Sequence, residues 1–180
     1  MRRALCLILA AATVTGAATA CVGPTPIPTL PPQPTATPVF GSEEEALAAA
    51  TAAYEEYLRV ADEVGQRGWA DAEGDLGTVV VDPLLSEELE TGASFELEGY
   101  TQSGQSTFDS VALQSAELYG DPQVIFYVCL DVSDVDVLGP DGQSVVPGGR
   151  PDRLPLEVEA LGAPPMKIAR SELWSGSDFC

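Results

Sequence analysis

Val124–Val132, the run VIFYVCLDV, decides the fold class of this chain. β-Branched and aromatic side chains dominate the run, and such residues favour a pleated strand that is at least half buried. Turn-forming residues lie on both sides: Gly120–Pro122 precede the run, and Gly139–Gly142 follow a short apolar stretch at Val135–Leu138. We therefore expect Val124–Val132 to be the central strand of a sheet.

Three more segments are expected to be strands: Thr107–Tyr119, Leu154–Leu161 and Met166–Trp174. The second of them alternates apolar and acidic side chains, which is typical of a strand with one face in a core. Leu156, Val158 and Ala160 would take the buried side, and Glu157 and Glu159 the other. The carboxy-terminal half of the chain therefore predicts an antiparallel sheet.

Upstream of the sheet, the segment from Ser42 to Gly65 has the features of a helix. Ser42 is an N-cap residue, and Glu45, three residues later, is its capping-box partner. Gly65 is the expected end. Between them, apolar residues recur at spacings of three and four: Leu47, Ala50, Tyr54, Tyr57, Leu58, Ala61 and Val64.

A second helix is expected to begin at Asp82-Pro83, a cap followed by a first-turn proline. Leu84, Leu85 and Leu89 would form its buried side. We expect Gly92 to interrupt this helix, and a third short helix to run over Ala93–Gln102. Trp69, in the loop between the first two helices, is expected to fill a gap in the core.

Helices first and antiparallel strands afterwards predict an α+β fold, with amino-terminal helices packed on the sheet. Composition excludes several functions. The 8 basic and 28 acidic residues give a formal net charge of −20, and such a chain repels nucleic acid. Histidine is absent from the sequence, which excludes Ser-His-Asp and Cys-His catalysis and removes the commonest zinc ligand. We expect neither a cofactor nor a metal ion.

The amino terminus has the three-part layout of a secretory signal peptide. Arg2 and Arg3 supply positive charge, Ala4–Ala12 is apolar, and small residues lead to Ala20, directly before Cys21. Cleavage after Ala20 with lipidation of Cys21 is the favoured interpretation. An uncleaved transmembrane helix and cleavage without lipidation stay open as alternatives.

A proline-rich segment, VGPTPIPTLPPQPTATPV, occupies Val22–Val39. Because proline fixes the backbone and removes a hydrogen-bond donor, this segment predicts an extended spacer. The expected organisation is a signal peptide at 1–20, a lipidated cysteine and stalk at 21–41, and a globular domain at 42–180.

The small residues before Cys21 resemble the lipobox of bacterial lipoproteins, with Ala18 at a position that is usually Leu. The rest of the mature chain resembles small secreted lipoproteins of high-GC Gram-positive bacteria that carry a nuclear transport factor 2-like (cystatin-like) domain. Three stretches carry the resemblance: VCLDVSDVDVLGPDGQSV (Val128–Val145), RPDRLPLEVEAL (Arg150–Leu161) and ARSELWSGSDFC (Ala169–Cys180). Met166 departs from related cones, which often have Trp at the start of the last strand. The resemblance implies a cone of helices on a curved antiparallel sheet at the extracytoplasmic face of the cell membrane, and assigns no activity.

Two cysteines remain after Cys6 leaves with the signal and Cys21 is lipidated. An even count in an oxidising compartment predicts a disulfide between Cys129 and Cys180. Two free thiols are the alternative. A catalytic cysteine is disfavoured because the sequence offers no histidine to activate it.

Asp131, Asp134, Asp136 and Asp141 fall within eleven residues of sequence. Calcium loops need carboxylates at tight alternate spacing, a glycine in mid-loop and a closing Glu. These aspartates lack that spacing, so we expect them on strand edges and in a turn.

Cones of this type often enclose a cavity, and relatives work there as isomerases or dehydratases. The candidate pocket-lining residues are Tyr54, Tyr57, Asp109 and Tyr127, although aromatic residues at helical spacing usually belong to a core. No catalytic residue is assigned. We expect a non-catalytic binding or scaffold module, held to the membrane by its lipid, with an unknown extracytoplasmic protein as partner. The alternatives are binding of a small apolar ligand and isomerase- or dehydratase-type catalysis in the cavity.

Overall fold

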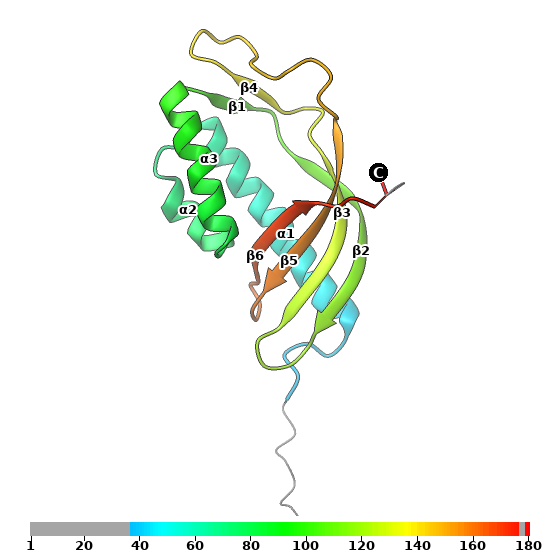
Figure 1. Cartoon of the computed structure of the whole chain (residues 1–180). Helices are drawn as coiled ribbons and strands as arrows, with labels where there is room; N and C mark the ends of the chain where they lie inside the picture. The colour runs from blue at the N-terminus through cyan, green and yellow to red at the C-terminus, as the bar shows by residue number, and fades with distance from the viewer. Residues whose placement is uncertain (1–36, 177–178) are drawn as a thin grey trace, which may run out of the picture. The chain divides into compact units, whose positions relative to one another are not determined.

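A computed structural model describes residues 37–176 and 179–180, and Figure 1 shows their arrangement. The helices are α1 (Glu43–Gln66), α2 (Ala72–Val79) and α3 (Leu84–Glu98). The strands are β1 (Thr101–Ser103), β2 (Thr107–Glu117), β3 (Gln123–Asp131), β4 (Asp136–Leu138), β5 (Arg153–Leu161) and β6 (Lys167–Leu173). The α+β class is confirmed. The predicted signal peptide and the lipidation site at Cys21 lie outside the described residues.

Two antiparallel sheets form the β part of the domain. The larger has the strand order β2-β3-β5-β6, and the smaller pairs β1 with β4. The prediction of Val124–Val132 as a central strand is confirmed, because β3 lies between β2 and β5. The four strands curve together, and α1 runs diagonally across one of their faces (Figure 1).

The core lies between α1 and this face of the larger sheet. Val124, Phe126 and Val128 point into it from β3 with no exposed surface. Tyr54 meets Phe126 edge-on from α1, with ring centroids 6.1 Å apart. Such T-shaped pairs add about 0.5–1.5 kcal/mol to the free energy of area burial. The alternation predicted for β5 is also confirmed, with Leu156, Val158 and Ala160 buried.

The start of α1 follows the predicted cap closely. The Glu45 backbone N–H donates to Ser42 Oγ at 3.2 Å. The Glu45 carboxylate accepts from the Gly41 N–H at 2.8 Å, one residue before the usual capping-box position. Among the residues that the structure describes, no helix combines the length and the apolar character needed to cross a bilayer.

The prediction of two helices separated at Gly92 is wrong, because α3 is continuous through this residue. Gly92 is instead the place where α3 passes over the buried Trp69: a Cβ built on Gly92 would lie 2.2 Å from Trp69 Cε3. Trp69 fills the core as expected. α2 was also not predicted from the sequence, and the helix expected over Ala93–Gln102 included Thr101 and Gln102, which belong to β1.

The loop between β1 and β2 approaches the loop after β3 very closely, backbone against backbone. Gly104, between β1 and β2, has φ +80°, and a Cβ there would lie 1.8 Å from the carbonyl oxygen of Asp134. Only glycine fits at such a contact. Arg150 donates from Nη2 to the carbonyl oxygens of Val132 and Val135, at 2.8 and 2.7 Å, which fixes the loop after β3.

Candidate functional site

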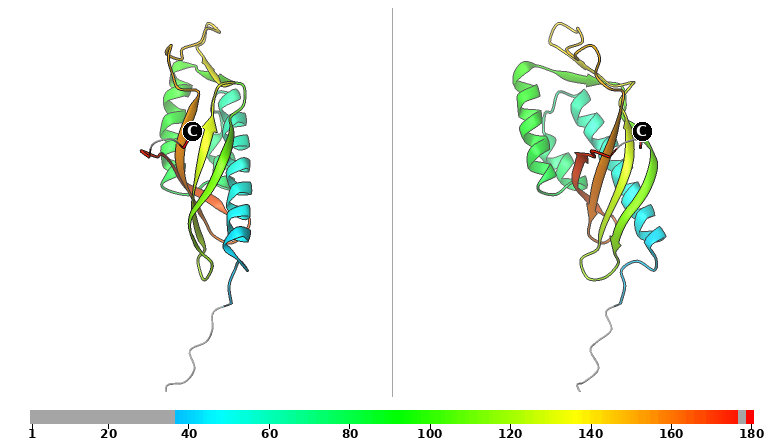
Figure 2. Two further views of the ribbon diagram at one scale, coloured as in Figure 1. Left: turned by 90° about the vertical axis from the view of Figure 1, so that its right-hand side faces the viewer. Right: turned by 45° about the vertical axis from the view of Figure 1, so that its right-hand side comes forward.

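A groove of about 580 Å³ lies between α1 and the start of β2, and we call it the α1–β2 groove. The view on the left of Figure 2 shows α1 running beside β2, which is an outer strand of the larger sheet. The lining residues come from one face of α1 and from the segment that leads into β2. Those from α1 are Ala52, Glu55, Glu56, Leu58, Arg59 and Asp62, and those from the other side are Gln105, Ser106, Thr107 and Phe108.

Asp62 is the buried end of this groove and is only 5% exposed. Its carboxylate accepts three hydrogen bonds: from Gln102 Nε2 at 2.6 Å, from the Ser106 N–H at 2.8 Å and from Ser106 Oγ at 3.0 Å. A buried carboxylate is tolerated when it is hydrogen-bonded in this way. Asp62 therefore fixes the start of β2 against α1 and gives the groove a rigid wall.

The remaining charges of the groove are exposed. Arg59 donates to Glu56 at 2.6 Å and to Glu63 at 2.5 Å, both on the same helix. The hydrogen bond from Arg59 lowers the pKa of Glu56, which stays ionised. Glu55 has no ion-pair partner among the described residues, so the lining carries an excess of negative charge.

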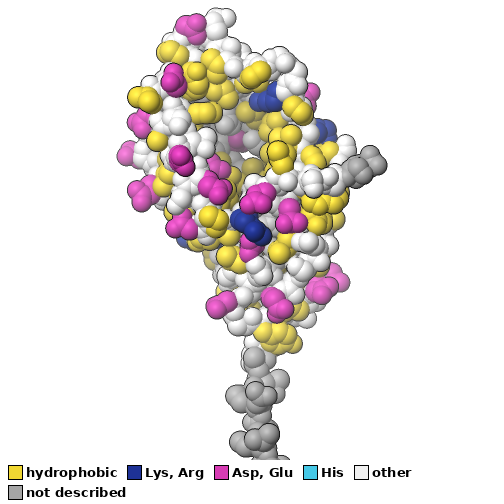
Figure 3. All heavy atoms as spheres, in the orientation of Figure 1, with side chains coloured by type: hydrophobic (Ala, Val, Ile, Leu, Met, Phe, Trp, Pro, Cys, Tyr) yellow, Lys and Arg dark blue, Asp and Glu magenta, His cyan; other side chains and the backbone are white. Residues whose placement is uncertain are grey.

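Other hollows indent the domain. One of about 440 Å³ lies between α2 and α3, next to Trp69. Another, of about 410 Å³ and mainly apolar, lies between the Ala49–Ala53 stretch of α1 and Pro164–Met166. Figure 3 shows a further hollow between α3 and the strands, on a face scattered with acidic side chains.

Tyr54 and Tyr57, two of the predicted pocket-lining residues, lie together on α1 with their ring centroids 5.8 Å apart. Tyr57 Oη donates to Glu88 Oε1 on α3 at 2.5 Å. Burial raises the pKa of Glu88, and it raises the pKa of Tyr54 to about 12. The pKa of Tyr57 is also raised, by burial and then by the charge of Glu88. This cluster joins α1 to α3, which forms one side of the hollow in Figure 3.

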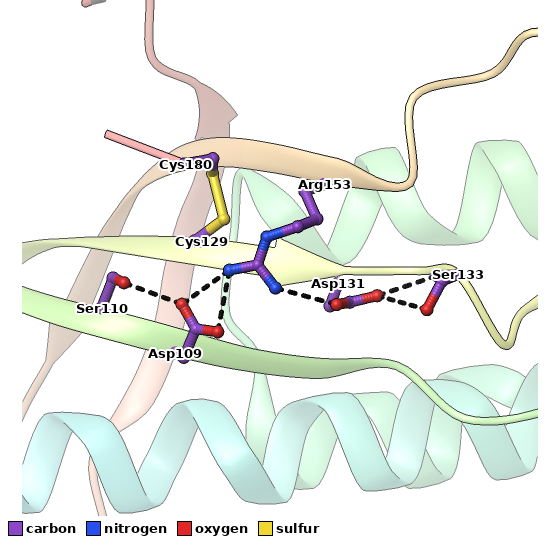
Figure 4. A network of polar contacts seen from close by, with 7 residues as sticks. All are labelled: Asp109, Ser110, Cys129, Asp131, Ser133, Arg153 and Cys180. Carbon is purple, nitrogen blue, oxygen red and sulfur yellow. Dashed lines mark hydrogen bonds and ion pairs between the residues drawn. A yellow bond between two sulfur atoms is a disulfide. The ribbon is translucent and has the colours of Figure 1, made fainter. Parts of the chain in front are cut away.

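Asp109 and Tyr127, the other two predicted residues, lie on the opposite face of the larger sheet, which we call the outer face. Asp109 accepts from Arg153 Nη2 at 2.8 Å, and Asp131 accepts from Arg153 Nη1 at 2.9 Å (Figure 4). The hydrogen bond from Arg153 lowers the pKa of Asp109. Hydrogen bonds from Ser133 do most to lower the pKa of Asp131. These carboxylates are ionised members of an exposed network, which is the opposite of what a general base with a raised pKa requires.

The four predicted residues therefore do not line one cavity. Strand alternation places Tyr127 and Asp109 on the outer face, whereas α1 covers the other face and buries Tyr54 and Tyr57. Sequence reasoning missed Glu88, because a Glu on a polar helix normally faces solvent. The acidic pair Glu55-Glu56 is the one sequence feature that points to the groove. It could not be recognised from the sequence, because the groove exists only where β2 lies beside α1.

The predicted disulfide is present: Cys129 and Cys180 are joined, with Cα atoms 5.5 Å apart (Figure 4). Cys129 is fully buried on the outer face of β3. Beside it, Tyr127 packs on Trp174 with ring centroids 4.7 Å apart, and Phe179 meets both rings. The described residues after β6 are thus fastened to the outer face by one covalent bond and two aromatic contacts, both with Tyr127.

The four aspartates between residues 131 and 141 do not converge. Asp136 accepts from Ser144 Oγ at 2.6 Å, and Asp141 accepts from the Gln143 N–H at 3.1 Å. Within residues 37–176 and 179–180, the structure brings no three acidic or cysteine side chains together in a way that could hold a metal ion.

Neither a protein-family model nor a curated protein sequence matches this chain. Among solved structures, the intermembrane-space region of the chloroplast protein ARC6 is similar in fold over 72% of this chain and 97% of that chain. The two share 11% sequence identity, with a TM-score of 0.43.

Proposed function

We propose that this chain is an exported lipoprotein, anchored through Cys21 to the extracytoplasmic face of the cell membrane, with a domain that binds another protein and performs no catalysis. The observation that carries the proposal is the disulfide between Cys129 and Cys180. Disulfides persist in oxidising compartments and are rare in reducing ones. The leader, with Cys21 directly after it, supports the same location.

The arrangement of the chain fits a tethered module. The domain follows the proline-rich segment directly. Phe40 is buried in its core, and Ser42 caps α1. A spacer of this composition extends by about 3.1 Å per residue. Two or more acyl chains on Cys21 would hold the protein stably, since each buried methylene contributes about 0.8 kcal/mol.

We also propose that the domain belongs with the nuclear transport factor 2-like cones. The order of helices before strands, the curved sheet and the position of α1 across one sheet face support this assignment. The hollow between α3 and the strands also supports the assignment, because cones of this type often enclose a cavity.

Anchoring is tested by replacing the cysteine that would carry the lipid. Wild type is expected in the membrane, in the detergent phase of a Triton X-114 partition and labelled by radioactive palmitate, whereas Cys21→Ser should incorporate no palmitate and should keep its leader. Cys6→Ser is the matched control, because Cys6 leaves with the signal and its loss should change nothing. Recovery of wild type from the aqueous phase would contradict the proposal.

A second function, binding of a small and mainly apolar ligand, is favoured by one observation. Glu88 is a half-buried carboxyl group with a raised pKa, and it accepts from Tyr57 on α1. Apolar surroundings with a few converging polar groups are typical of ligand sites. Binding of 4-phenylbutylamine to wild type, weakened in Glu88→Gln, would support this function; equal binding by both would exclude Glu88 from it.

A further inference from the structure

The α1–β2 groove lies beside a sheet edge that no other strand covers in the described chain. β2 pairs with β3 alone, so half of its backbone N–H and C=O groups face away from the sheet. The edge at β6 differs. There, Val80 forms a bridge with Ile168, and the Val81 N–H donates to the Ile168 carbonyl oxygen at 3.0 Å.

Only a short part of the β2 edge is regular. Thr107–Asp109 pair in register with Cys129–Asp131, but the register shifts after Asp109, and Ser110 has φ +57°. A second irregularity lies between Leu113 and Ser115. Bulges of this kind prevent long edge-to-edge pairing. They leave a three-residue stretch, next to the groove, where one short extended segment can pair.

The negative charge of the groove favours a positively charged partner. Glu55, Glu56 and Asp62 face it, and its one cation, Arg59, is already held between Glu56 and Glu63. Glu55 is exposed and has no ion-pair partner among the described residues. The backbone edge supplies pairing for an extended chain, and the carboxylates supply attraction for Lys and Arg side chains on it.

We propose that the α1–β2 groove binds an extended, basic segment of a partner protein, which adds to the sheet as a strand beside Thr107–Asp109. Main-chain hydrogen bonds to β2 would give affinity, as in other cases of strand addition. Glu55 and Glu56 would give selectivity for positive charge. The inference rests on the proposed function, since it names the kind of partner that the tethered module takes.

The test is site-specific photocrosslinking of the full-length lipidated protein in its native cells. The photoreactive residue p-benzoylphenylalanine replaces Gln105, at the groove, or Leu97, a control position on α3 that is 85% exposed. Amine-reactive reagents are unsuitable, because Lys167 is the one lysine of the chain and donates to the Gly77 carbonyl oxygen at 2.6 Å. Mass spectrometry then identifies the partner residues joined to position 105.

We expect capture from position 105 and not from 97, with the captured residues in a segment rich in Lys and Arg. Glu55→Lys should reduce capture by about tenfold, because repulsion replaces attraction. Glu90→Lys, the same charge change on an exposed turn of α3, should leave capture unchanged. Circular dichroism melts establish that both variants are folded.

Any of three results overturns the inference: no capture from position 105, capture of an acidic segment, or equal loss in the two charge-reversal variants. The anchoring proposal is tested by a different result, the partition with the membrane. If the protein partitions with the membrane and the groove captures nothing, the tethered location stands and the basic partner does not.

Discussion

Glu88 is a residue whose charge opposes folding. Its carboxyl group lies between α3 and α1 and accepts from Tyr57, and burial raises its pKa above the ordinary value of 4.5. A raised pKa means that the folded state favours the protonated form. The stability contributed by Glu88 is therefore fully present below pH 4.5 and is lost as pH rises through the raised pKa of the folded state.

Glu88→Gln should remove this pH dependence, because the amide oxygen can accept from Tyr57 without ionising. We expect the variant to gain unfolding free energy over wild type when the pH is raised from 4 to 7. Urea unfolding of both proteins at the two pH values measures this gain. Glu90→Gln, exposed on the same helix, should show no such difference. A Glu88→Gln effect that is equal at both pH values would mean that Glu88 does not titrate in a buried environment.

Gly92 makes room for the Trp69 ring, and a methyl group there would overlap it at 2.2 Å. Gly92→Ala should lower the free energy of unfolding by about 1–3 kcal/mol, as overpacking does. Gly74→Ala is the matched control: it also lies in a helix, and its Cβ would meet nothing within 4 Å. That change should be neutral or stabilise by about 0.4–1 kcal/mol. Equal changes in stability for the two variants would show that the Trp69 contact does not set the effect at Gly92.

At the residue scale, the sequence predicted well which side chains are buried. It predicted less well which side chains contact one another. The 3.6-residue period correctly put Tyr54 and Tyr57 on one side of α1. The two-residue period of β3 separates Tyr127 from Phe126 and Val128, but which face α1 covers depends on tertiary packing. Glu88 could not be predicted, since its burial is decided by the position of α3 relative to α1.

At the scale of elements, the carboxy-terminal segment depends on its disulfide. The bridge between Cys129 and Cys180 spans 51 residues of sequence. In the chain-entropy relation, a loop of this length contributes about 4 kcal/mol. Trp174 and Phe179 pack on Tyr127 beside it, so the same bond holds the aromatic contacts of the outer face in place.

The double variant Cys129→Ser/Cys180→Ser should therefore lose about 4 kcal/mol of unfolding free energy in chemical denaturation. Its Trp fluorescence should also change as Trp174 leaves Tyr127. Thiol labelling of denatured wild type without reductant is the control, and we expect no labelled cysteine. Quantitative labelling of Cys129 and Cys180 in that sample would show that the bond does not form in the cell.

Elements with strong local signals were predicted from the sequence. α1 has a cap and an apolar stripe, and β3 and β5 have clear strand composition. The expected end of α1 at Gly65 is displaced, because the helix continues to Gln66. α2 was missed because Gly74 and Gly77 are unfavourable in a helix; it is stabilised by packing, with Leu76 fully buried. The pairing of β1 with β4 has no local signal, since three residues on each side meet only after the chain has folded.

At the scale of the whole molecule, we propose an acidic domain that a proline-rich spacer tethers to a membrane. The whole chain has a formal net charge of −20, and such a charge repels anionic lipid headgroups. It also favours encounter with basic partners, and this electrostatic attraction weakens as salt rises. The groove beside β2 is the place where that attraction and an open strand edge coincide.

This electrostatic account predicts the salt dependence of partner capture. Crosslinking from position 105 in isolated membranes should fall when the salt concentration rises from about 0.1 M to 1 M, as the Debye length shrinks from about 10 Å to 3 Å. Membrane retention through Cys21 should be unchanged over the same range, because acyl chains do not depend on charge. Capture that is insensitive to salt would contradict the role given to Glu55 and Glu56.

The central claim is that Cys21 carries the lipid that holds this protein to the membrane, and the most direct measurement is the intact mass of the native product. We predict a chain that begins at residue 21, is heavier than its sequence by a diacylglycerol group on the cysteine and any further amino-terminal acyl chain, and is lighter by the two hydrogens lost to one disulfide. A mass that corresponds to an unmodified Cys21, or to a chain with its leader still attached, would contradict the account.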